Sequence, residues 1–314
     1  MVLSSRTFRN RLALCGVVAL ILAAGAARAE SVQPQAAKAA GRAPKPKPVA
    51  STAAAPVVSV EEGLQQTKKS PKDPSGYLAL GGAYRRAGRY QEAVDTYKRL
   101  LVIAPNNSTA HVSLGAAYMD LKRPDDAERE FRKALKLNPA DPSAHYNLGN
   151  FYVAKGRRDD ALSEFRRATQ LSPPIADAWV SMGLIQAELG KQEDAAQGYK
   201  KALAIDSTNV RALTNLANAM YSQGKVPEAT ALYRKALHYD DKNQEANYNM
   251  GVAFADAQIF KQALAYWKRV VEIDSTSAVG ESAKSSIQIL EDFLSSQQGK
   301  TVQQSPSGVT IEKH

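Results

Sequence analysis

The feature that most constrains the fold of this chain is a 34-residue sequence period, sustained from position 74 to position 277. Six blocks follow one another there without insertion or deletion: 74–107, 108–141, 142–175, 176–209, 210–243 and 244–277. A fixed period of this length is typical of stacked repeat architectures. In these, each unit buries its apolar face only against its neighbours.

The register of the period is defined by four positions, which we number as slots 1 to 34 of each block. Slot 7 is Leu or Met, slot 8 is Gly except for Ala217, and slot 20 is always Ala. Slot 24 is always aromatic: Tyr97, Phe131, Phe165, Tyr199, Tyr233 and Trp267. Small residues at slots 8 and 20 let two helices approach closely, and large residues fill the space between pairs. Each block is therefore predicted to be a helix, a short turn and a second helix.

This pattern closely resembles that of the tetratricopeptide repeat family, and the resemblance covers 204 of the 314 residues. It implies an all-α fold: a right-handed superhelical solenoid of six 34-residue helix-turn-helix repeats plus a C-terminal capping helix. Pro105, Pro139 and Pro173 near slot 32 agree with this reading. Proline cannot continue the hydrogen-bond ladder of the second helix.

The ends of the repeat array are expected to be closed by further helices. The cap is predicted at 278–297, where Val279, Ala283, Ile287, Leu290 and Leu294 share one helical face. A short leading helix is predicted within 57–73, because Ser59 is followed by two acids at the start of a helical pattern. Residues 298–314 are predicted to form a disordered tail.

The start of the chain, residues 1–29, has the pattern of a secretory signal peptide. Arg6, Arg9 and Arg11 precede a charge-free stretch from 12 to 27, and Ala27-Arg28-Ala29 has the spacing that a signal peptidase recognises. Cleavage near Ala29 would make the protein periplasmic or secreted, and would remove Cys15, the one cysteine. The alternative is an uncleaved signal that anchors the chain to the inner membrane. The stretch is shorter than the roughly 20 residues that a spanning helix needs.

Most of the net charge lies ahead of the repeats. Residues 1–56 hold eight Lys or Arg and one acid, about +7 of the formal net charge of +10. Residues 30–56 are rich in Ala, Pro and Lys and are predicted to be a disordered linker that could touch an anionic envelope surface. Since the body is close to neutral, no nucleic-acid partner is expected.

No residue pattern in the sequence indicates catalysis, a cofactor or a metal site. The four histidines, His111, His145, His238 and His314, lack the short spacings that zinc sites use. His111 and His145 occupy slot 4, where the family usually packs an aromatic ring, and we interpret them as packing residues. The protein is therefore predicted not to be an enzyme.

The resemblance implies that a partner binds on the first helices, whose slots 2, 5, 6, 9, 12 and 13 line a concave groove in the family. Asparagine amides at these slots offer a donor and an acceptor to an extended backbone, although Asn there is also part of the generic pattern. Three bases against five acids at these slots favour a neutral or mildly basic protein segment or helix. The candidate peptide-binding residues are Tyr146, Asn147, Asn150, Asp177, Asn215, Asn218, Tyr221, Glu245, Tyr248 and Asn249.

A second candidate surface lies on the second helices, where slots 25 and 26 are basic in all six blocks. The fourth and fifth blocks have no acid in the adjoining turns. Lys200, Lys201, Arg234 and Lys235 are therefore predicted to form a ridge that could face an anionic surface. The alternative is a solvated basic face near the helix C-termini.

These patterns predict a protein-interaction scaffold or adaptor, monomeric or weakly oligomeric, that binds a protein or peptide of the cell envelope. Family analogy points to pilus, secretion, outer-membrane or cytochrome assembly. The alternative is an accessory subunit that recruits or regulates an envelope enzyme such as a cell-wall hydrolase or protease.

Overall fold

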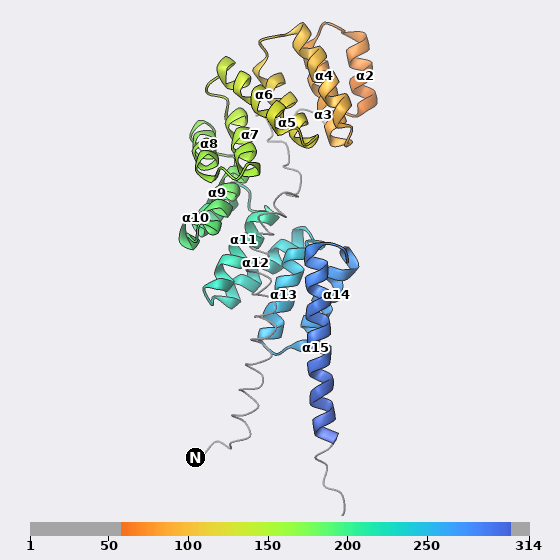
Figure 1. Ribbon diagram of the computed structural model, residues 1–314, viewed down its shortest axis with the longest axis vertical. Coiled ribbons are helices and arrows are strands. Elements are labelled where there is room, and N and C mark those ends of the chain that lie inside the picture. The colour runs from red at the N-terminus through yellow and green to blue at the C-terminus, as the bar shows by residue number, and fades with distance from the viewer. Residues whose placement is uncertain (1–57, 303–314) are drawn as a thin grey trace, which may run out of the picture. The chain divides into compact units, whose positions relative to one another are not determined.

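The computed structural model describes residues 58–302, which consist of helices joined by short turns without a strand (Figure 1). Twelve helices form six consecutive pairs, and the starts of the first helices follow the 34-residue period. The pairs are α3 (Pro74–Arg86) with α4 (Tyr90–Ile103), α5 (Ser108–Asp120) with α6 (Pro124–Leu137), α7 (Pro142–Ala154) with α8 (Arg158–Leu171), α9 (Ala176–Glu188) with α10 (Gln192–Ile205), α11 (Val210–Ser222) with α12 (Val226–Tyr239), and α13 (Gln244–Asp256) with α14 (Phe260–Ile273). Each of the six predicted blocks thus contains two helices joined by a short turn, as the sequence predicts.

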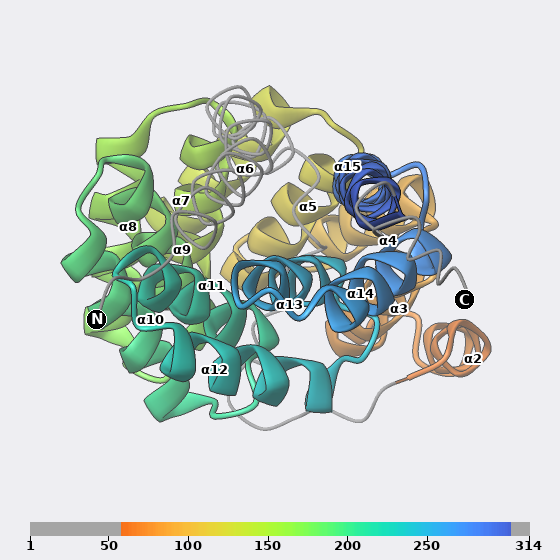
Figure 2. The same cartoon turned by 90° about the horizontal axis from the view of Figure 1, so that it is seen from below.

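The described helices form two compact units, the first from α2 (Val60–Lys69) to α10 and the second from α11 to α15 (Ala278–Val302). In the first unit each helix packs against the next one along the chain. Figure 2 shows α5 to α10 following an arc, with α5, α7 and α9 on its inner side. The first helices therefore line the concave side of that unit. We call the corresponding surface of any pair its first-helix face.

Most of the first helices begin where a side chain caps them. Five side chains accept a hydrogen bond from a backbone N–H of the first turn, namely Asp73, Asn107, Asp141, Asn209 and Asn243. This satisfies a donor that a helix start leaves unpaired. The exception is α9, whose N-cap residue Ile175 has no side-chain acceptor and is buried instead.

In every pair except α11 and α12, which has Ala217 at slot 8, the glycine at slot 8 lies directly against the aromatic ring at slot 24. A Cβ added to Gly115, Gly149 or Gly183 would come within 2.5 to 2.7 Å of the ring of Phe131, Phe165 or Tyr199. These distances are shorter than real carbon contacts, so only glycine allows this approach. The rings are 0 to 2% exposed. The contact thus fixes the distance between the two helices of a pair.

The turn between paired helices requires a left-handed backbone at slot 15. Gly88, Gly156, Gly190 and Gly224 have φ between 72° and 76° there. Lys122 and Gln258 occupy the same slot with φ of 58° and 60°. Side-chain-bearing residues adopt this conformation at a cost of roughly 1–2 kcal/mol.

Helices close both ends of the described chain. In α2 the Ser59 Oγ accepts from the Glu62 N–H at 3.1 Å, and Glu62 Oε2 accepts from the Ser59 N–H at 2.7 Å. Helix α15 buries Ala283 and Leu290 against α14 and α13, as its apolar pattern predicts.

The prediction that the last helix ends at 297 is wrong, because α15 continues to Val302. The first proline after 297 is Pro306, and Gly299 alone does not end a helix. The predicted signal peptide, the linker and residues 303–314 of the predicted tail lie outside the described residues.

Two neighbouring glycines test the packing at slot 8. We expect Gly81→Ala to lower the free energy of unfolding by about 1–3 kcal/mol, because its Cβ would overlap the Tyr97 ring. Gly82→Ala should raise it by about 0.5–1 kcal/mol, since its Cβ would meet only side-chain ends, the Arg86 Nη1 at 3.5 Å and the Tyr97 hydroxyl at 4.0 Å, and alanine favours helix. Urea denaturation measures both variants. Equal changes in the free energy of unfolding, of the same sign in both variants, would contradict the close contact between Gly81 and the Tyr97 ring.

Substitutions at slot 15 test the turn. Lys122→Gly and Gln258→Gly should each stabilise the protein by about 1 kcal/mol, because glycine adopts the left-handed backbone without the Cβ penalty. Thermal denaturation followed by circular dichroism measures the gain. As a control, Lys136→Gly in helix α6 should destabilise by a similar amount.

Candidate binding surfaces

Slot 5 of the first helices lies inside the protein rather than on the first-helix face. The prediction that Tyr146 presents an aromatic surface to a partner is wrong: it is 2% exposed, and its ring centroid lies 5.7 Å from that of Phe165. Val180 at the same slot is fully buried. Slot 5 precedes slot 8 by three residues and therefore shares the side of the helix that packs against the second helix.

The asparagines at slot 6 remain on the first-helix face but are partly used within their own helices. Asn147 and Asn215 are half-buried, and each Nδ2 donates to the carbonyl four residues earlier, that of Ser143 or Arg211, at 2.8 Å. Each amide keeps its Oδ1 and a second N–H. Asn150, at slot 9, has a buried Nδ2 with no acceptor among the described residues.

A connected hydrogen-bond network lies on the first-helix face of α11 and α13. Asn218 Nδ2 donates to Glu245 Oε1 at 2.8 Å, and Asn218 Oδ1 accepts from Asn249 Nδ2 at 2.8 Å. The same Oδ1 accepts from the hydroxyl of Tyr233 at 2.6 Å. The network fixes the orientations of Asn218, Glu245 and Asn249 before any partner binds.

Two acids give this face its charge. The Tyr221 hydroxyl donates to Asp256, and burial together with this bond raises the pKa of Tyr221. Glu245 keeps an exposed surface, yet the protein around it partly dehydrates the carboxylate and raises its pKa. The hydrogen bond from Asn218 and the charge of Arg211 act in the opposite direction.

Several of the other predicted groove residues are already engaged. Tyr248 is half-buried beneath the C-terminal helix, where its hydroxyl lies 3.2 Å from the Ser286 Oγ of α15. Asp177, half-buried on α9, also has an interaction within the protein. These two side chains offer less to a partner than the sequence pattern indicates.

The excess of acids at the groove slots is largely compensated in the first unit. Arg85 Nε lies 2.8 Å from Asp120 Oδ2, and Arg158 Nε lies 2.7 Å from Glu188 Oε2. Both ion pairs join neighbouring pairs of helices. The two acids of the second unit at these slots, Glu245 and Asp256, both lie on α13.

The two slot-4 histidines pack inside their repeats, which confirms the packing role predicted for them. His111 Nδ1 lies 2.6 Å from Glu130 Oε2, and His145 Nδ1 lies 2.6 Å from Glu164 Oε2. The second ring nitrogen of each lies near a proline carbonyl oxygen, at 3.3 Å for Pro105 and 3.0 Å for Pro139. An imidazolium can donate to both acceptors at once, whereas a neutral ring can donate to one.

Comparison with known proteins agrees with this architecture. The sequence model of the family described as the cilia and flagella-associated protein 70 C-terminal domain, a tetratricopeptide repeat domain, matches residues 23–285. The chain belongs to this tetratricopeptide repeat family. No curated protein sequence matches the chain.

Solved structures of other tetratricopeptide repeat proteins share the fold. PilF of Pseudomonas aeruginosa matches with a TM-score of 0.61 and 20% identity over 68% of this chain and 96% of its own. PilW, described as a type IV pilus biogenesis factor, matches with a TM-score of 0.58 and 20% identity over 66% of this chain and 96% of its own. The Cut9–Hcn1 structure matches with a TM-score of 0.65 and 13% identity over 73% of this chain and 45% of its own.

The predicted basic ridge of the tetratricopeptide repeats is exposed, but its members differ. Lys201 Nζ lies 4.3 Å from the centroid of the Trp179 ring, and Arg234 Nε donates to the Thr230 carbonyl at 3.4 Å. Lys200 and Lys235 extend from the surface. Lys200 and Lys201 belong to the first unit, whereas Arg234 and Lys235 belong to the second. The anionic-surface ridge therefore stays a prediction.

The sequence pattern did not predict that Tyr233 belongs to the hydrogen-bond network. Tyr233 is read from sequence as a core ring, yet its hydroxyl reaches Asn218. The sequence signal for this contact is that slot 24 holds Tyr rather than Phe in a repeat whose slot 9 holds asparagine.

Within 58–302 no helix is both long and apolar enough to cross a lipid bilayer, and no cluster of His, Cys, Asp and Glu in these residues could hold a metal ion.

The His145 pair predicts a pH-dependent contribution to stability. Burial lowers the pKa of His145, but the bonds to Glu164 and the Pro139 carbonyl outweigh burial and the nearby Arg167, so its pKa is raised above 6.5. The stabilisation is therefore fully present below pH 6.5 and is lost as the pH rises through the raised pKa. The difference in free energy of unfolding between wild type and His145→Phe should be larger at pH 6 than at pH 8.5. Glu164→Gln should abolish or reverse this pH dependence, because burial then outweighs the remaining bond to the Pro139 carbonyl. A difference that grows with pH would contradict the assignment.

Proposed function

We propose that the protein is a non-enzymatic interaction scaffold that binds a segment of a partner protein on the first-helix face of α11 and α13. The supporting observation is the network of Asn218, Glu245 and Asn249. Polar groups that are already held in place lose little conformational entropy on binding, which favours affinity for a complementary segment. Asn215 and Tyr221 extend the same face.

The charge of this face indicates a neutral or mildly basic segment. Glu245 and Asp256 contribute two carboxylates, against the single base Arg211. An extended backbone could pair with the remaining donors and acceptors of Asn215 and Asn249. Asn147 and Asn150 would provide a second stretch of polar contacts on the first unit.

We further infer that the partner belongs to the cell envelope, in a process such as pilus, secretion, outer-membrane or cytochrome assembly. The support is the signal-peptide pattern of residues 1–29, together with the fold shared with PilF and PilW. Fractionation followed by N-terminal sequencing tests this. An intact Met1 in the cytosolic fraction would contradict it.

Site-specific photocrosslinking tests the binding face. A crosslinking residue at Asn215 should capture the partner on illumination of living cells, whereas one at Ala231 should not. Ala231 is exposed on α12 of the same unit and serves as the control. Equal capture at the two positions, or capture only at Ala231, would contradict the proposal.

The charge and the network can be separated by two variants in the crosslinking background. Glu245→Gln keeps an acceptor for Asn218 but removes the charge, so capture should fall severalfold at low salt and converge with wild type at high salt. Asn218→Ala removes the centre of the network and should reduce capture at both salt concentrations. Unchanged capture in both variants would show that this face is not the binding surface.

A further inference from the structure

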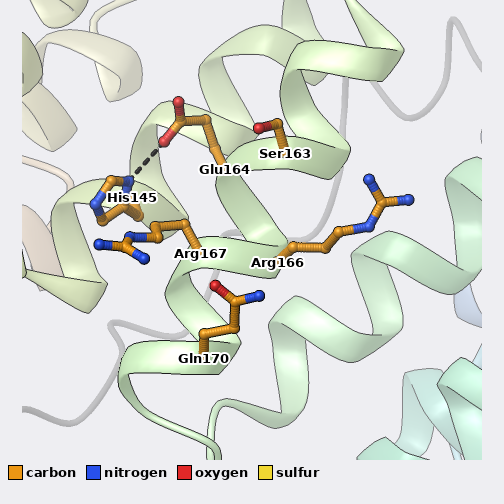
Figure 3. Close-up of a pocket in the computed structure, with 6 residues that line it drawn as sticks. All are labelled: His145, Ser163, Glu164, Arg166, Arg167 and Gln170. Atoms are coloured by element: carbon orange, nitrogen blue, oxygen red, sulfur yellow. Dashed lines mark hydrogen bonds and ion pairs between the residues drawn. The ribbon is translucent and has the colours of Figure 1, made fainter.

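A polar pocket lies beside the third helix pair, mostly along its second helix, α8. Its volume is about 410 Å³, and it is lined by His145, Ser163, Glu164, Arg166, Arg167 and Gln170. Figure 3 shows Arg167 beside the His145–Glu164 pair, while Arg166 extends to the opposite side. Every lining side chain is polar, so the pocket favours a charged or hydrogen-bonding group.

Comparison with the preceding repeat shows how the basic pair of the third repeat differs from that of the second. At the same slots, Arg132 is paired with Glu128 at 2.7 Å, and Lys133 with Glu130 at 2.9 Å. Arg132 is also hydrogen-bonded to the side chain of Tyr152 in the next repeat. Thus both cations of the second repeat have partners within the protein.

The third repeat lacks the two partners of Arg132 but keeps a glutamate, Glu164, at the slot of Glu130. Leu162 stands where Glu128 stands in the second repeat, and Gln186 stands where Tyr152 does. Glu164 is bonded to His145 at 2.6 Å, just as Glu130 is bonded to His111. No carboxylate among residues 58–302 lies within ion-pair distance of Arg166 or Arg167, and the Gln186 Oε1 is buried without a hydrogen-bond donor.

The cationic surface continues from this pocket onto the fourth repeat. Arg166 also lines a smaller pocket of about 160 Å³ with Trp179, Gln186 and Lys201. That pocket is open because slot 11 holds Gln186 and slot 23 holds Gly198, in place of larger residues at the same slots of neighbouring repeats. Besides His145, the charged residues that line the two pockets together are three bases, Arg166, Arg167 and Lys201, and two acids, Glu164 and Asp194.

We propose that this surface of α8 and α10 is a second docking site, which binds an acidic segment of a protein partner through Arg166, Arg167 and Lys201. Guanidinium groups bind carboxylates in a bidentate geometry, and two adjacent unpaired arginines suit a segment with closely spaced Glu or Asp. His145 is recessed, with 12% of its side chain exposed. A carboxylate side chain can enter such a recess, whereas a flat lipid surface cannot.

Binding of a fluorescent peptide of alternating Glu and Ser to the full chain tests the proposal by anisotropy. Arg166→Gln with Arg167→Gln should weaken binding by about tenfold or more, because charge-assisted contacts are lost. The same change in the second repeat, Arg132→Gln with Lys133→Gln, should change affinity less than twofold, since those cations are already paired. Gln186→Tyr places a tyrosine beside Arg166 at the slot from which Tyr152 contacts Arg132. This variant should weaken peptide binding severalfold without removing a charge. Thermal denaturation verifies that each variant is folded.

Three results would overturn the proposal. The first is equal weakening by both double variants, which would indicate diffuse charge rather than a site. The second is binding to phosphatidylglycerol vesicles that depends on Arg166 and Arg167 when peptide binding does not. The third is no peptide binding at low ionic strength. The first-helix face of α11 and α13 does not include Arg166 or Arg167. The experiments on the two proposed sites can therefore give independent outcomes.

Discussion

The structure depends on the contact between a small residue on the first helix of each pair, glycine in five of the six pairs and Ala217 in the fifth, and an aromatic ring on the second. Because Gly149 has no Cβ, the ring of Phe165 lies directly against its backbone, and the same contact recurs in the neighbouring pairs. This contact sets the separation of the two helices. Its recurrence in successive repeats sets the surface that each pair presents to the next one, so stacking follows from one local contact.

Much of the fold could be predicted from sequence, because its determinants are local and periodic. Ser59 and Glu62 form the capping box expected of a helix start, and the helix pairs follow the 34-residue period. The candidate site was less predictable, since slot numbers do not give the partner of a side chain. Tyr146 is buried by Phe165, and Arg85 neutralises Asp120 from a neighbouring pair of helices. Both contacts join residues that are distant in sequence.

The functional information of the chain lies in departures from the repeat. In the second unit, Asn218 and Asn249 align with a tyrosine hydroxyl at slot 24, which builds a fixed polar network on the first-helix face. In the first unit, Leu162 and Gln186 replace the two residues that contact the counterpart of Arg166 one repeat earlier, which leaves Arg166 available. The scaffold therefore tolerates specialised surfaces on both sides of the helix pairs without a change in their packing.

The measurement that most directly tests this account is hydrogen–deuterium exchange of the Gly149→Ala variant against wild type. If stability comes from contacts between neighbours, backbone protection should fall in α7 and α8, fall less in α6 and α9, and stay unchanged in α2 to α4. A uniform loss of protection across residues 58–302, or no loss in α7 and α8, would contradict the central role of the glycine–aromatic contact.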